Sequence, residues 1–516
     1  MFSRLGGLAA RRFSPLNRSV VALLFLVLLV SASGGALETD QYYAWGRPLA
    51  DSTDAINARF NLELERALAD FPVDAPPAEC TEISIAYRKR LRFILFHSIQ
   101  LWTMNTSQVA RIPADSEENR TYRKTNLYSN HPLIDSGTWM PFTPTIEVAG
   151  VRFGTDKLSH LVSSGWTYYS TYNKALKSNG HDPHEAVRVA VRRGILEESL
   201  ILGAMASGVT SIADLEASLQ GVYFYSDLCD VEDPILQRRS YGWTITRSID
   251  LRDYVGPRWD ESYQPPIYSK GRWRKVRPVL TTYCNRLADP KVVEMLRRYR
   301  ARDTQTVVGE VVAELVAVGK LEDPAQFSLE AVCAVPKAPA AAPPDTTSVP
   351  TPAPAVDGTE MKERIVAEEQ DRRRMALGLL GFQLTYPQVV AASIGVMATS
   401  QPSDYDCPTA CDYWGPFAQL EPGLGGGKVS VGWGRAIATT GKDGRFLTNV
   451  FMALAGKATV LRTWGDFGAV ESGRTFAGAE LDFSVARVNF GLGILYRVSS
   501  GDDSPWLVTG GIGWGF

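Results

Sequence analysis

The spacing of hydrophobic residues along the chain changes near Leu377. Before this point, apolar residues recur every three or four positions, which is the spacing of amphipathic helices. We predict helices over residues 53–70, 81–104, 155–178, 183–207, 211–224 and 289–319. After this point, apolar residues alternate with glycine and polar residues, which is the period of β-strands. The pattern predicts a multidomain α + β protein, with a mainly α-helical domain followed by an antiparallel β domain.

Eight segments of the C-terminal region fit the strand period. The clearest are 476–486, 488–498 and 506–516, and the others are 378–386, 388–399, 415–425, 426–438 and 446–464. In the second of these, one face carries Val488, Phe490, Leu492, Ile494, Tyr496 and Val498, and the other carries Asn489, Gly491, Gly493 and Arg497. Strands of about 9–11 residues with one apolar face are typical of membrane-spanning barrels.

The composition of the two strand faces favours a barrel that contacts lipid on its outside. A barrel of about eight strands has an interior that side chains fill. The chain ends in Phe516, and a terminal aromatic strand resembles the assembly signal of Gram-negative outer-membrane barrels. We therefore expect residues 377–516 to form a C-terminal antiparallel β-barrel whose partner is outer-membrane lipid. A soluble antiparallel barrel or sandwich with the same alternation is the alternative.

The N-terminal residues have the three parts of a secretory signal peptide. Basic residues up to Arg18 precede an apolar run from Val20 to Val30, and small residues follow it. The run has about half the length that a membrane-spanning helix needs. We therefore assign residues 1–36 to a signal peptide and residues 37–333 to an exported helical domain. A retained single-helix anchor is the alternative.

Residues 334–376 separate the two domains. The part up to Asp357 is rich in proline and alanine and lacks a hydrophobic period, which favours a semi-rigid, extended linker. The charged stretch that starts at Glu360 favours a helix, and we expect this helix to be a solvated connector. The linker is the main boundary between the two domains.

Charge and cysteine content narrow the classes of function. The chain has 54 Lys and Arg residues against 56 Asp and Glu residues, so its net charge is only -2. This balance would not attract a polyanion, and we expect no nucleic-acid partner.

The six cysteines are an even number in a chain that we expect to be exported, so disulfides are permitted. Cys407 and Cys411 are close enough to pair across a loop, which leaves three sets of pairs open for Cys80, Cys229, Cys284 and Cys333.

Candidate catalytic residues begin on the helix predicted from residue 155. Thr155 is a suitable N-cap, and Asp156 and His160 follow at a spacing of four, which places them on one helix face. In the next helix, the apolar stripe passes through Glu198, and a buried carboxylate is costly unless it is paired or bound to a metal. Glu197 is expected to face outward, although a small rotation of the helix would exchange the two glutamates.

A third helix adds another carboxylate. Ser211 can cap this helix, and Asp214, Ser218 and Gly221 share one of its faces. Each candidate also has a purely structural explanation. Asp214 can be part of a variant capping box, an acid near a helix N-terminus complements the helix dipole, and a single histidine can be an ordinary core residue.

The order of these residues resembles a known family pattern. A D-K-x-x-H helix, a glutamate within a helix and an S-x-x-D-x-x-x-N-x-x-G segment are similar to those of VanZ-like proteins. The matching residues are Asp156, Lys157 and His160, then Glu197 or Glu198, then Ser211, Asp214 and Gly221, and Ser218 replaces the family's asparagine. The resemblance covers about residues 150–225. It implies a compact helical core with inward-facing polar residues that acts on lipid or lipid-linked head groups.

Two mechanisms fit an imidazole flanked by carboxylates. In the first, His160 is a general base or nucleophile oriented by Asp156 or Asp214, and Lys157 stabilises an anionic phosphoryl or acyl group. In the second, His160, Glu198 and Asp214 hold a divalent metal ion that activates water. Only one histidine is available in this group, so we favour the mechanism without a metal cofactor.

A second group of candidates lies between residues 249 and 284, where arginine, lysine and aromatic residues are dense. Trp259 and Tyr263 could stack on the sugars of an anionic glycan, and Arg274 or Lys275 could bind phosphate. An ordered loop that covers the helical core with its basic groups solvated is the alternative.

The sequence therefore predicts a cell-envelope protein of the outer membrane. The helical domain is expected in the periplasm, because an N-terminal extension of such a barrel usually stays on that side. As a hydrolase or transferase, this domain would act on lipid or lipid-linked glycan head groups by acid/base phosphoester or acyl chemistry. The alternative is a non-catalytic binding or structural protein that the barrel anchors.

Overall fold

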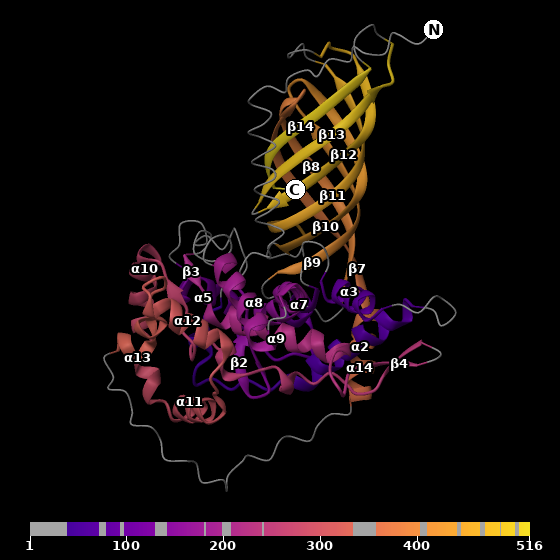
Figure 1. Ribbon diagram of the computed structural model, residues 1–516. Helices are drawn as coiled ribbons and strands as arrows, with labels where there is room; N and C mark the ends of the chain where they lie inside the picture. Colours follow the sequence, from indigo (N-terminus) through magenta and orange to yellow (C-terminus); the bar gives the residue numbers. More distant parts are fainter. Residues whose placement is uncertain are drawn as a thin grey trace.

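The computed structural model consists of a helical region and a β-barrel that projects from it (Figure 1). It describes residues 39–71, 79–92, 98–129, 142–179, 182–198, 208–239, 242–333, 358–402, 410–440, 445–464, 470–485, 487–500 and 505–515. The predicted signal peptide and the proline- and alanine-rich linker lie outside the described residues. The predicted α + β architecture is confirmed.

The helical region contains a helix in each predicted range and two others. The range 289–319 is not one helix, because residues 303–306 interrupt it, and the helix that starts the range 81–104 ends at Leu91. Its longer helices are α2 (Thr53–Ala69), α3 (Cys80–Leu91), α4 (Ser98–Asn105), α5 (Ser116–Thr125), α7 (Gly165–Asn179), α8 (Pro183–Glu197), α9 (Ile212–Cys229), α10 (Lys270–Thr281), α11 (Pro290–Arg302) and α12 (Val307–Ala317). The sequence pattern missed α5 and α10. The first is almost entirely polar, and the second contains Pro278, so neither shows a clear apolar stripe.

Short elements connect the helices around Asp156 and His160. The helix predicted from residue 155 is divided into α6 (Asp156–Ser159), a π-helical segment η2 (His160–Ser164) and α7. Two short antiparallel pairs flank it, β1 (Thr145–Val148) with β2 (Val151–Gly154), and β3 (Val209–Thr210) with β6 (Ile267–Tyr268). The second pair holds the start of α9 next to the chain that follows the short helix η5 (Pro257–Trp259).

Helix α9 lies at the centre of the helical core. It packs against α7, α8 and η2, and the side chain of Phe224 is completely buried among aromatic rings that include Phe60 and Tyr254. Helices α7 and α9 approach very closely at Gly165 and Gly221. A Cβ atom on Gly221 would lie 2.3 Å from Cα of Gly165, so only glycine permits this approach. This explains why the motif that ends in Gly221 requires a glycine there.

Two disulfides join distant parts of the helical region. Cys80 at the start of α3 is bonded to Cys229 at the end of α9, and Cys284 is bonded to Cys333. The expectation of disulfides is therefore confirmed, and the structure selects one of the three pairings that the sequence left open. Cys407 lies outside the described residues, so its pairing with Cys411 stays a prediction.

The C-terminal region is a closed eight-stranded antiparallel barrel, as predicted. Its strands are β7 (Arg372–Tyr386), β8 (Val389–Pro402), β9 (Cys411–Pro422), β10 (Gly426–Thr440), β11 (Leu447–Thr463), β12 (Thr475–Val485), β13 (Val488–Arg497) and β14 (Trp506–Gly515). Each strand pairs with the next, and β14 pairs with β7 to close the ring. The first strand begins at Arg372, five positions before the boundary predicted from the alternation.

The outer face of the barrel is apolar. Most of the exposed large hydrophobic side chains among the described residues lie on it, including Leu420, Val431, Leu492, Trp506 and Val508. Side chains fill the interior in layers. Two lysines and three acids form a buried central layer (Lys428, Lys457, Glu421, Glu480 and Asp482), with apolar side chains on either side of it along the barrel.

The connector helix α14 (Gly358–Gln370) docks on the helical region rather than standing in solvent. Ile365 is fully buried, and Glu369 pairs with Arg59 and Arg66 of α2. The expectation of a solvated connector was wrong. The charged stretch shows no periodic apolar face, so its sequence did not reveal these contacts. Helix α14 leads directly into β7 and therefore fixes this end of the barrel to the helical region.

No helix in the described part of the chain has both the length and the apolar character needed to cross a membrane.

Candidate functional site

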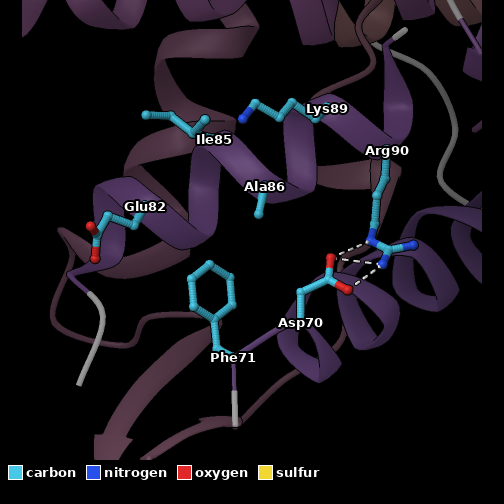
Figure 2. Close-up of a pocket in the computed structure, with 7 residues that line it drawn as sticks. All are labelled: Asp70, Phe71, Glu82, Ile85, Ala86, Lys89 and Arg90. Carbon is cyan, nitrogen blue, oxygen red and sulfur yellow. Dashed lines mark hydrogen bonds and ion pairs between the residues drawn. The ribbon is translucent and has the colours of Figure 1, made fainter. Parts of the chain in front are cut away.

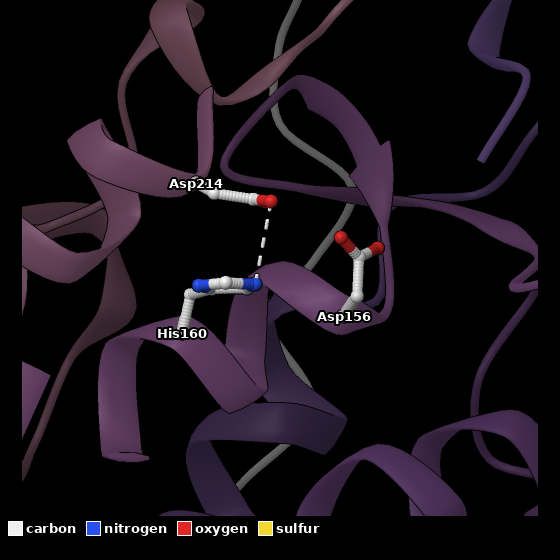
Figure 3. Close-up of side chains that lie close together, drawn as sticks. All are labelled: Asp156, His160 and Asp214. Carbon is white, nitrogen blue, oxygen red and sulfur yellow. Dashed lines mark ion pairs between the residues drawn. The ribbon is translucent and has the colours of Figure 1, made fainter. Parts of the chain in front are cut away.

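The candidate site is assembled where α6, η2 and the start of α9 meet (Figure 3). The one-turn helix α6 carries Asp156 and Lys157, and His160 is the first residue of the π-helical segment. Single turns of π-helix inside α-helices are frequent at functional sites, because the wider turn re-aims the side chains. Across from them, Ser211 caps α9 by accepting a hydrogen bond from the backbone N–H of Asp214 at 3.2 Å. The cap fixes the first turn of α9 and, with it, the Asp214 carboxylate.

Lys157 is the centre of the charge network. Its Nζ atom lies 2.6 Å from Oδ2 of Asp156, 2.7 Å from Oδ1 of Asp214 and 2.8 Å from Oε1 of Glu261. Its side chain is only 1% exposed. An ammonium group has three N–H donors, so these three carboxylates account for all of them. Lys157 therefore organises the acids of the site and is not available to stabilise a substrate anion, which was its predicted role.

His160 lies between an acid and a hydroxyl. Its Nε2 atom is 3.4 Å from Oδ2 of Asp214, and its Nδ1 atom is 3.4 Å from Oγ of Ser218. Ser218 stands where the VanZ-like pattern has asparagine, and here it faces the imidazole. The imidazole is the most exposed side chain of the group, at 10%. A reactant that approached this cluster would therefore meet His160 before the lysine and the acids.

The remaining oxygen of Asp156 is also satisfied. Its Oδ1 atom accepts hydrogen bonds from the hydroxyls of Thr39 at 3.2 Å and Thr143 at 3.1 Å. Glu261 accepts a further hydrogen bond from Ser211 at 2.7 Å. The three donors come from separate parts of the chain, and they hold the two acids in place before any ligand binds.

Burial and charge shift the pKa values of the network. Burial lowers the pKa of Lys157, but Asp156, Asp214 and Glu261 outweigh it, so its pKa lies well above the ordinary value and the ammonium stays charged. Burial raises the pKa of Asp214, but His160 and Lys157 outweigh it, so that its pKa is lowered and it is a carboxylate at neutral pH. Burial raises the pKa of Glu261 to about 7; the charge of Lys157 opposes the shift, and Asp214 and Asp156 add to it. The site thus holds a permanent cation, a permanent anion and a glutamate that can carry a proton near neutral pH.

The same group has the composition of a metal-binding set. Asp156, His160 and Asp214 each offer one ligand atom, and these three atoms all lie within 4.8 Å of one another. Glu198 does not belong to this set among the described residues, so the expected ligand set of His160, Glu198 and Asp214 is corrected to one with Asp156. Both oxygens of Asp156 and one of Asp214 already contact protein donors. A metal ion would have to compete with these contacts.

Glu197 is the last residue of α8, and Glu198 follows it. As the apolar stripe predicted, Glu198 faces inward and Glu197 faces outward. Glu198 is 6% exposed, and its charge helps to raise the pKa of the buried Tyr168 hydroxyl, after the larger effect of burial. Glu197 faces outward and accepts a hydrogen bond from Nε of Arg193 at 2.9 Å. Neither glutamate is among the three acids that contact Lys157.

The aromatic and basic residues of 249–284 do not form a second half of the site. Trp259 is 1% exposed and packs edge-on against Phe153 with ring centroids 5.1 Å apart, so its face is not open to a sugar. Tyr263 donates a hydrogen bond to Asp303 at 3.0 Å. Arg274 and Lys275 are exposed on α10. The predicted sugar-stacking role of Trp259 is corrected, because the density of aromatic residues did not reveal which of them are core residues.

Glu261 is the residue of the site that the sequence did not reveal. It follows Trp259 and Asp260 in a segment without regular period, where helix spacing and capping give no information. The two threonines that contact Asp156 are likewise in irregular segments. The only signal was the placement of acids directly after a buried aromatic residue, and this signal is too common to indicate a site.

A separate pocket of about 450 Å³ lies between the end of α2 and α3 (Figure 2). Its lining includes Phe71, Ile85 and the ion pair of Arg90 with Asp70, whose closest atoms are 2.7 Å apart. Unlike the cluster around Lys157, this pocket does not bring several acids to one buried cation, and we assign no chemistry to it.

Comparison of the chain with protein-family models, curated proteins and solved structures finds no match. The functional argument therefore rests on the geometry of the site and on the surface of the barrel.

Proposed function

We propose that this protein is a cell-envelope enzyme that its barrel anchors in the outer membrane of a Gram-negative bacterium. Its helical domain, which we place in the periplasm, uses His160 for acid/base phosphoester or acyl chemistry on lipid or lipid-linked glycan head groups. The observation that carries the proposal is the position of His160. It lies between Asp214 and Ser218 and is the least buried side chain of a network with one lysine and three acids.

In the proposed reaction, His160 moves one proton. Asp214 is ionised and faces Nε2, so it holds the imidazole in position and stabilises its protonated form. Ser218 is a neutral partner of Nδ1 and can give way to water. Nδ1 takes a proton from the water that attacks phosphorus or the carbonyl carbon. The protonated imidazole then returns this proton to the oxygen of the leaving group as its bond breaks.

Lys157 acts as a positioning residue in this scheme. With three carboxylates in contact, its ammonium prevents Asp156 and Asp214 from repelling each other. It occupies the place between the acids that a metal ion would otherwise take. This favours chemistry without a metal cofactor, which is also what the single histidine indicated.

A divalent metal bound by Asp156, His160 and Asp214 is the second candidate. It is favoured by the proximity of the three ligand atoms and by the excess of acids over the single lysine. Metal analysis of the purified full-length chain decides between the two. We expect no stoichiometric metal, and one equivalent that is lost in the Asp156→Asn variant would establish the metal-dependent alternative.

The proposed anchor is supported by the barrel surface. Each strand exposes large apolar side chains on its outer face, whereas soluble proteins rarely expose contiguous apolar patches of this extent. Every strand of the barrel has at least 10 residues, which is long enough to cross a membrane, and the filled interior fits a small barrel. Heat-modifiable migration of the full-length chain from the outer-membrane fraction tests the anchor, and complete extraction by carbonate would contradict it.

The catalytic proposal is tested against the non-catalytic alternative with three variants. His160→Ala and Asp214→Asn should abolish head-group release from a Gram-negative envelope lipid extract, with the helical signal in circular dichroism unchanged. Glu197→Gln is the matched control, because this glutamate faces outward and pairs with Arg193. If the chain releases no head group, or if all variants behave alike, the helical domain is a binding or structural module.

A further inference from the structure

A cavity of about 350 Å³ lies at the junction between the helical region and the barrel. Helices α2, α3, α4 and α14 form one side of it, and strands β9 and β10 form the other. The junction itself is closed by apolar contact, since Leu101 of α4 packs with Ile437 and Phe451 of the barrel. Asn105 adds a hydrogen bond to the backbone oxygen of Ala410 at 3.0 Å. The cavity is therefore part of a built interface between the two domains.

Toward this cavity, the side chains on the outer face of β9 and β10 change from aliphatic to aromatic. Leu420, Val429 and Val431 are exposed and apolar, and Trp414 and Trp433 follow with ring centroids 5.9 Å apart. In barrels that cross a membrane, an apolar band is bordered by aromatic residues at the level of the lipid head groups. The two tryptophans would mark that level here.

The charged residues of the cavity come directly after the tryptophans. Nε of Arg435 donates to Oδ1 of Asp412 at 2.8 Å, and both side chains are about a quarter exposed, at 23% and 25%. The next outward residue of β10 is Ile437, which contacts the helical region. The cavity thus opens where lipid head groups would lie, and it borders the rings of Trp414 and Trp102.

The lining carries both signs of charge. It contains three arginines (Arg59, Arg90 and Arg435) and four carboxylates (Glu63, Glu368, Glu369 and Asp412). The groups are held in place before any ligand binds. Glu368 accepts from Thr106 at 2.7 Å and from the backbone N–H of Ser107 at 2.9 Å, and the Arg59 guanidinium lies 5.3 Å from the ring centroid of Trp102. Glu63 and Glu369 pair with Arg59 and with Arg66, so Glu368 is the acid of the helical side whose printed contacts are hydrogen bonds alone. A zwitterion can place its ammonium at Glu368 and its phosphate at Arg435.

We infer that this cavity binds the head group of a zwitterionic aminophospholipid from the leaflet that faces the helical domain. The phosphate contacts Arg435, the ammonium contacts the acids on the helical side, and the acyl chains follow the barrel past Trp414. The inference rests on the proposed anchor, because the lipid reaches the cavity only from a surrounding bilayer. The lipid would fix the helical domain against the membrane surface.

Native mass spectrometry of the full-length chain tests this site. The chain is reconstituted in bilayers with equal amounts of phosphatidylethanolamine, phosphatidylcholine and phosphatidylglycerol and is then released in mild detergent. We expect one phosphatidylethanolamine to be retained per chain, favoured about tenfold over phosphatidylcholine, whose quaternary amine cannot donate a hydrogen bond to the acids. Phosphatidylglycerol should be disfavoured as well, because it has no cation for the acids.

Two variants and one matched control complete the test. Trp414→Ala and Arg435→Gln should each lower retention of phosphatidylethanolamine about tenfold, which is the loss of one charge-assisted or aromatic contact. Trp514→Ala should not lower it, because this tryptophan is also exposed on the barrel but lies outside the cavity lining.

The outcomes separate the lipid site from the anchor. Equal retention of the three lipids, or equal loss in the Trp414 and Trp514 variants, by an inserted chain shows only a general lipid shell and overturns the site. Preference for phosphatidylglycerol overturns the assignment of a zwitterion. Failure of the wild-type chain to insert, scored by heat-modifiable migration, overturns the anchor and the lipid site together.

Discussion

Nζ of Lys157 lies 2.8 Å from Oε1 of Glu261, which is 104 positions further along the chain. This contact brings the loop after η5 to the helix that carries Asp156. With Asp214 from α9, it places one cation among three acids in a buried site. Removal of the cation should therefore affect the fold of the helical domain and not only its chemistry.

We expect Lys157→Met to destabilise the helical domain by about 3–5 kcal/mol, because it leaves buried carboxylates without their cation. Urea unfolding of the full-length chain in detergent, followed at 222 nm, measures this, since the helices of the described residues all precede β7. Lys362→Met is the control. Lys362 pairs with Glu65 at the surface, and its loss should cost about 1 kcal/mol or less. Similar effects of the two variants would contradict the proposed central role of Lys157.

Glu216 should make the stability of the helical domain depend on pH. Burial raises the pKa of Glu216 from 4.5 to about 7, while a hydrogen bond from Thr306 and the charge of Arg258 oppose the shift. The folded state therefore holds this proton more tightly than the unfolded state. Its contribution is fully present below about pH 4.5 and is lost as the pH rises to about 7, by up to about 3 kcal/mol.

The Glu216→Gln variant should remove this part of the pH dependence. Its free energy of unfolding relative to the wild type should rise as the pH increases from about 4.5 to 7 and then stay level. A flat difference for Glu216→Gln would show that the pKa of Glu216 is the same in the folded and unfolded states.

The close approach of α7 and α9 gives a steric prediction. In Gly221→Ala, the new Cβ atom would lie 2.3 Å from Cα of Gly165 and 2.5 Å from the backbone oxygen of Leu161. The helices must separate, which should cost about 1–3 kcal/mol and lower head-group release, because Leu161 is adjacent to His160. Gly271→Ala in α10 meets no atom within 4 Å, so it should be neutral or stabilising. Urea unfolding of both variants measures the difference.

The barrel could be predicted because the alternation of strand residues is determined by neighbouring positions in the sequence. Strand alternation has a period of two, and the outward residues read from the sequence, such as Leu492 and Trp506, are exposed in the structure. Strand ends were less certain, and β9 begins at Cys411 rather than at residue 415 because its first residues alternate less clearly.

The site was predictable only where helix geometry controls it. Asp156 and His160 share a helix face, and Asp214 follows a capping serine, so spacing alone could group them. Glu261 comes from an irregular segment, and its approach depends on the tertiary fold. The same limit explains Trp259, whose burial depends on Phe153 in a distant hairpin.

The most direct test of the central claim is head-group release by the full-length chain in outer-membrane lipid vesicles made with water labelled with oxygen-18. We expect the wild type to release head groups in the presence of a metal chelator. One of the two products should carry one oxygen-18 atom, which comes from the attacking water. His160→Gln should reduce the rate by at least about a hundredfold, which is the contribution of a general acid/base group. An unchanged rate in His160→Gln, or no release by the wild type, would contradict the assignment of His160 as the acid/base residue of this site.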